Sequence, residues 1–117
     1  MNDKKTVLVK ESIEENILIL KKPVFIDGEE KTKIPYDFDK LSGENIENVF
    51  KASTKSGYMV SASYELDPVI GARMFAEAAD LDYADVKRFT MSDYSKAASV
   101  ARDFFIQGLA GNQEENN

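Results

Sequence analysis

The chain has 117 residues, of which 43% are hydrophobic and 31% charged, and it has a net charge of −6 with neither Cys nor His. This size and composition are typical of one soluble globular domain without a disulfide framework, which suits a reducing cytoplasm. The lack of His excludes Ser-His-Asp catalysis and His-ligated zinc, the acidic charge disfavours nucleic acid, and no apolar run reaches the roughly 20 residues that span a bilayer.

Residues 1–16 mix charged side chains with few apolar ones, and we expect a flexible N-terminal extension. Residues 17–38 then predict a β-hairpin. Its second arm alternates in the way a half-buried strand requires, with one face formed by Thr32, Ile34, Tyr36 and Phe38. Asp27 and Gly28 supply the backbone freedom of a tight turn, and Pro23 in the first arm favours an edge strand.

Four helices follow in the prediction, each opened by an apolar residue and then a residue that can cap a helix. The expected ranges are about 43–55, 68–79, 82–88 and 91–109, and the capping residues are Ser42, Asp67, Asp82 and Thr90. The second helix has several Ala residues at helical spacing, which permits close approach of a neighbour. Residues 111–117 are polar and acidic, and we expect a disordered tail.

These elements together predict one α+β domain over residues 17–110, in which an N-terminal β-hairpin packs on three to four α-helices.

The sequence offers little that could support catalysis or metal binding. No Gly-rich phosphate loop is present, and Asp80, Asp82 and Asp85 lack the spacing, the central Gly and the final Glu of a calcium loop. Asp37 and Asp39 could act as a general acid and base, but at a strand end they are better interpreted as turn residues. We therefore expect no enzyme and no catalytic, cofactor or metal site.

The last helix is apolar on most sides, through Phe104, Phe105, Ile106 and Leu109. Either this helix is central and buried all round, or part of its apolar surface is a docking face. In the second case we expect Phe105 to face the core and Phe104, Ile106 and Leu109 to bind a partner. The hairpin edge could also accept a strand, although its Lys residues would discourage this.

The run KKPVFIDGEEKTKIPYDFDKLSGENI, followed by DPVIGARMFAEAADLDYADVKRFTMSDYSKAASVARDFFIQGL, resembles the small tail assembly chaperones of long-tailed bacteriophages and related prophage elements. The resemblance covers about residues 18–109, and the order of the motifs is more specific than any one of them. The matching positions are Lys22, Pro23, Val24, Asp27, Gly28, Asp37, Phe38, Asp39, Leu41, Gly43, Phe89, Asp93 and Phe105.

The resemblance implies a protein without enzymatic activity or cofactor. Such a chaperone would bind the tape measure protein in the cytoplasm of the bacterial host, keep it soluble and help to recruit tail tube subunits. The alternative is a structural tail component, such as a tube-terminating or connecting protein, that stays in the particle. The sequence leaves a homo-oligomer open in either case.

Overall fold

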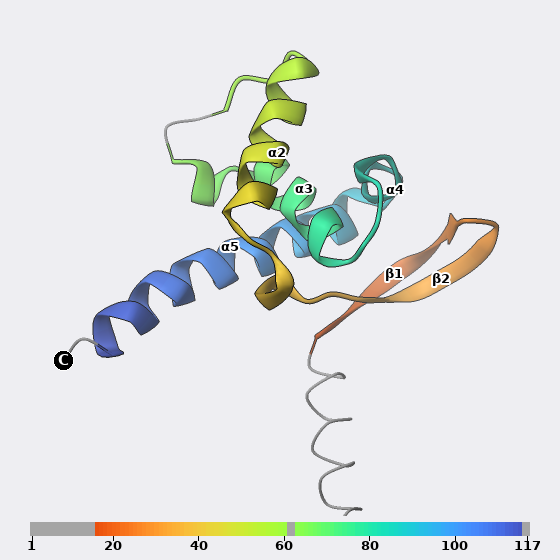
Figure 1. The fold of residues 1–117 in the computed structure, drawn as a ribbon. Helices are drawn as coiled ribbons and strands as arrows, with labels where there is room; N and C mark the ends of the chain where they lie inside the picture. Colours follow the sequence, from red (N-terminus) through yellow and green to blue (C-terminus); the bar gives the residue numbers. More distant parts are fainter. Residues whose placement is uncertain (1–15, 61–62, 116–117) are drawn as a thin grey trace, which may run out of the picture.

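The computed structural model describes residues 16–60 and 63–115, and within them a hairpin precedes four α-helices (Figure 1). The elements are β1 (Ile17–Ile26), β2 (Glu29–Pro35), the 3-10 turn η1 (Phe38–Lys40), α2 (Gly43–Lys55), the 3-10 turn η2 (Tyr64–Leu66), α3 (Pro68–Ala78), α4 (Tyr83–Lys87) and α5 (Met91–Glu115). The predicted α+β fold is confirmed. The predicted N-terminal extension lies, except for Asn16, outside the described residues.

The two strands pair in antiparallel fashion around a turn of two residues. Asp27 and Gly28 have φ of 52° and 81°, which is the left-handed backbone that this kind of tight turn requires. The register then shifts along β1, because Val24 pairs with Lys31 whereas Ile19 pairs with Lys33. Residues 20–23 therefore stand opposite Thr32 alone and form a bulge. Pro23 belongs to this bulge, where a missing backbone N–H costs no ladder hydrogen bond.

The hairpin is shorter than the predicted 17–38, because β2 ends at Pro35. The side chain of Asp37 accepts a hydrogen bond from the backbone N–H of Asp39 at 3.0 Å and thereby opens η1. Ile34 and Phe38 are buried as the alternation predicted, but Thr32 is exposed because it lies opposite the bulge. A local cap thus replaces the last part of the predicted strand.

The bulge of β1 is held by one carboxylate from the first turn of α5. Asp93 is fully buried, and it accepts hydrogen bonds from the backbone N–H of Lys21 at 3.0 Å and of Lys22 at 3.2 Å. The ammonium of Lys96 lies 3.4 Å from the same carboxylate and also donates to the carbonyl of Ile19 at 2.7 Å. These contacts attach the hairpin to the helices along the outer edge of β1.

Helix α3 is the centre of the helical part, with contacts to α2, α4 and α5. Its buried residues are Ile70, Gly71, Ala72, Met74, Phe75, Ala76 and Ala78. The facing residues of α5 include Ala97, Ala98 and Ala101, which are also buried. Small side chains on both helices let the two backbones approach closely, as the sequence predicted. A Cβ atom added at Gly71 would lie 2.9 Å from the carbonyl oxygen of Ala98.

The helix ends agree with the prediction to within one residue except at the end of α5, which continues to Glu115 rather than stopping near 109. Gly108 and Gly111 lie inside this helix. The helix tolerates them because Gly lowers helix propensity by about 1 kcal/mol but, unlike Pro, removes no backbone hydrogen bond. The second half of α5 runs beyond the other helices (Figure 1). In residues 16–60 and 63–115, none of the helices has the length and apolar character that a membrane crossing needs.

We expect Gly71→Ala to destabilise the fold by about 1 to 3 kcal/mol, because the new methyl group would force α3 and α5 apart. Gly108→Ala is the matched control, since nothing lies within 4 Å of its added Cβ and Ala favours the helix. Urea unfolding followed by circular dichroism measures both. Equal stability of the two variants would show that the helices do not approach as closely as described.

Asp93→Asn should destabilise the fold by about 2 to 3 kcal/mol, because an amide offers one acceptor oxygen where the carboxylate offers two. Burial alone would raise the pKa of Asp93, but the N–H groups of Lys21 and Lys22, the Thr90 side chain and the Lys96 ammonium outweigh it and hold the pKa below the usual 3.8. The stability from this carboxylate is therefore complete above about pH 4 and falls as the pH drops through the lowered pKa.

The measurement is urea unfolding of the wild type and Asp93→Asn between neutral pH and pH 3. The stability difference between them should shrink as the pH falls below about 4. A difference that stays constant over this range would contradict a charged Asp93 in the folded protein.

Candidate partner-binding surface

The segment Asp37–Gly43, which has the sequence DFDKLSG, forms η1 and the start of α2 through two successive caps. Asp37 caps η1, and the backbone N–H of Leu41 closes it by donating to Phe38 at 3.1 Å. Ser42 then starts α2, where its backbone N–H donates to the side chain of Asn45 at 2.9 Å. Because both caps are local, this short segment has a defined shape that presents Phe38 and Leu41 to α5.

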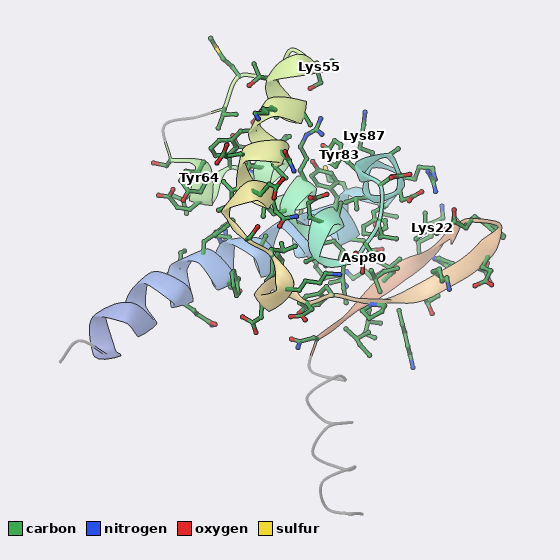
Figure 2. The ribbon with its side chains drawn as sticks, in the orientation of Figure 1. Lys22, Lys55, Tyr64, Asp80, Tyr83 and Lys87 are labelled. Carbon is green, nitrogen blue, oxygen red and sulfur yellow. The ribbon has the colours of Figure 1, made fainter. Side chains whose placement is uncertain are left out.

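Phe38 is buried beneath Phe104 of α5, and the two rings stack with centroids 5.0 Å apart. This pair belongs to a continuous series of aromatic contacts through the domain. The series runs Phe75, Tyr36, Phe38, Phe104, Phe105, Tyr64 and Phe50, with successive centroids between 5.0 and 6.3 Å apart. It connects the core of α3 to the second half of α5, and Figure 2 shows Tyr64 on the segment that follows α2.

An open groove of about 290 Å³ lies between η1, the start of α2 and α5. Its lining consists of Phe38, Asp39, Leu41, Ser42, Gly43, Ile46, Met74 and Phe104, and we call it the Phe104 groove. Phe104 remains 38% exposed despite its stacking on Phe38. The floor and walls are mainly apolar, and Asp39 contributes an exposed carboxylate at the rim. Such a groove can accept apolar side chains of another polypeptide.

The three residues predicted to bind a partner do not form one face. Phe104 lies in the groove, while Ile106, which is 45% exposed, stands about 200° further around the helix. The side chain of Leu109 lies outside the described residues. Phe105 is half-buried and packs against the core and Tyr64, as expected. The alternative that α5 is buried all round is wrong, because Phe104 and Ile106 are exposed. Helix α3 occupies the central position instead.

Sequence patterns did not predict a polar cluster of three Tyr side chains near α3. The hydroxyls of Tyr83 and Tyr94 hydrogen-bond at 2.8 Å, and the guanidinium of Arg73 lies 4.1 Å from the centre of the Tyr83 ring. Figure 2 shows Tyr83 where α4 approaches α3. Burial, and then the bond to Tyr83, raise the pKa of the Tyr94 hydroxyl. Tyr83 and Tyr94 lie on different helices, α4 and α5, and have no common motif that could have revealed this contact.

The remaining member of the cluster, Tyr58, donates to both oxygens of Asp67 at 3.0 and 2.9 Å. This hydrogen bond is the main reason that the pKa of Tyr58 is raised. Asp67 also caps α3 by accepting from the N–H of Val69 and Ile70, as its position before Pro68 predicted. The polar groups of the cluster thus connect and cap helices.

Several of the carboxylates that were considered for catalysis or calcium binding act in caps and ion pairs. Asp37 caps η1, while Asp80 pairs with Lys40 and Asp85 with Arg88. Within residues 16–60 and 63–115 no three or more carboxylates gather in a way that could hold a metal ion.

Comparison with family models, curated proteins and solved structures finds no match to this chain.

Replacing Phe105 and Phe104 one at a time should separate the core from the groove. We expect Phe105→Asp to cost about 3 kcal/mol, because it places a charge among packed aromatic rings. Phe104→Asp should cost about 1 kcal/mol, mainly the lost stacking on Phe38. Circular dichroism during urea unfolding checks the order. Equal losses would mean that Phe104 is as much a core residue as Phe105.

Proposed function

We propose that this protein is a tail assembly chaperone of a long-tailed bacteriophage or related prophage. It binds the tape measure protein, keeps it soluble and helps to recruit tail tube subunits in the cytoplasm of the bacterial host. The supporting observation is the order of its parts, in which a hairpin leads into DFDKLSG and then into a series of capped helices. This order is what the resemblance to the tail assembly chaperones rests on.

The geometry supports the proposal because the DFDKLSG segment forms one wall of the Phe104 groove. Phe38, Asp39, Leu41 and Gly43, which are among the positions that match the chaperones, therefore line exposed apolar surface. An amphipathic helix binds in such a groove through a row of apolar side chains, and binding covers its apolar face from other chains. The net charge of −6 helps to keep a complex dispersed. This chemistry needs a docking surface and no reactive group.

Co-expression with the tape measure protein encoded nearby tests the proposal. We expect the wild type to raise the soluble fraction of the tape measure protein several-fold and to co-purify with it. Phe104→Asp should remove most of this gain, because a carboxylate in the groove opposes burial of apolar side chains.

Met91→Asp is the matched control, since Met91 is 85% exposed on the same helix, about 20 Å from Phe104. This variant should behave as the wild type. Unchanged solubility of the tape measure protein with and without the wild type would contradict the proposal. Mass spectrometry of purified particles separates the structural alternative, because a chaperone should be missing from them and a tail component should be present.

A further inference from the structure

The charges of β2 are divided between an internal pair and two residues without a partner. Lys31 and Glu29 form an ion pair at 2.8 Å. Glu30 and Lys33 are exposed, and neither side chain makes a hydrogen bond or ion pair with any residue of the described part of the chain. One uncompensated negative charge therefore lies near the turn, and one uncompensated positive charge lies toward the other end of the strand.

These two charges lie on the same face of the sheet, although they are three positions apart along the chain. Glu30 pairs with Phe25 and Lys33 pairs with Ile19, and both apolar partners point to solvent, 62% and 54% exposed respectively. In a regular strand, residues three apart would face opposite sides. The irregular register around Thr32 brings both onto the outer face, next to exposed apolar side chains.

The two edges of the hairpin differ in how they are covered. The edge of β1 receives Asp93 and Lys96 from α5, and Arg88 donates to the carbonyl of Phe25. No hydrogen bond from the described helices reaches β2. The hairpin extends from the helices past α4, and its second strand lies on the far side from that helix (Figure 1). An uncovered strand edge is a template for another strand.

We propose that β2 binds β2 of a second copy of this chain in antiparallel fashion, so that two hairpins form a four-stranded sheet. Two-fold symmetry then places Glu30 of each copy opposite Lys33 of the other, and Lys31 opposite Thr32. Opposite residues of an antiparallel pair share a face, which Glu30 and Lys33 already do. Each row across the outer face contains Phe25, Glu30 and then Lys33 and Ile19 of the second copy.

Neighbouring registers are less favourable. A shift of one residue in either direction places Lys31 opposite Lys31 or opposite Lys33 of the other copy, and like charges directly opposite each other are destabilising. Lys residues on an edge normally prevent pairing, but in this register Glu30 of the other copy lies opposite Lys33 and on the same face of the sheet. The pairing also joins two sheets of two strands each, and a sheet of two strands has limited stability of its own. The inference does not depend on the proposed function.

The test is light scattering of the full chain during size-exclusion chromatography over a range of concentrations. The wild type should reach twice the mass of one chain as the concentration rises. Glu30→Lys and Lys33→Glu should each weaken the dimer about tenfold, because each places like charges opposite one another at two symmetric points. Both positions are exposed, and circular dichroism verifies that the variants fold.

Complementary variants make the result specific for this register. An equimolar mixture of Glu30→Lys and Lys33→Glu should dimerise again, and so should the double variant that contains both changes. Lys55→Glu makes the same charge change at the far end of α2, away from the hairpin (Figure 2), and should dimerise as the wild type. A wild type that remains monomeric at every concentration, single variants that dimerise normally, or a mixture that fails to dimerise would each overturn the proposal.

Discussion

The hydrogen bonds between Asp93 and the bulge of β1 support the rest of the domain. They join backbone and side chain across 72 residues of sequence, and they give acceptors to two N–H groups that the bulge removes from the ladder. The hydroxyl of Thr90 accepts a hydrogen bond from the backbone N–H of Asp93 at 3.1 Å and so caps the start of α5. The side chain of Asp93 is thereby left to bind β1. These hydrogen bonds therefore hold the hairpin against the first turn of α5.

Close packing of α3 and α5 explains why apolar side chains remain exposed. Gly71 and the Ala residues on both helices let them lie side by side, but α5 is longer than its partner and continues past it. Beyond that point η1 and η2 cover the helix, through the stacking of Phe38 on Phe104 and the contact of Tyr64 with Phe105. Because η1 is short, it leaves a groove beside Phe104. The exposed apolar surface is therefore a consequence of the length of α5.

The groove and the outer edge of β2 are built from different elements, and they suit different interactions. The groove offers apolar side chains with a carboxylate at the rim, which fits side chains of a helix. The strand edge offers backbone groups and two opposite charges, which fits another strand. The Tyr83 and Tyr94 hydroxyls and the Asp67 carboxylate are occupied in linking and capping helices, and this lends rigidity to the body between the two surfaces.

Local chemistry made much of the fold predictable. The Asp27-Gly28 turn, the caps at Ser42, Asp67 and Asp82, and the small residues facing α5 depend on neighbours a few positions away, so their sequence signals are direct. The bulge of β1, the direction of the Asp93 side chain and the stacking of Phe104 on Phe38 could not be read in this way. Each of them depends on contacts between segments far apart in the chain, and such contacts exist only when the hairpin and the helices have packed together.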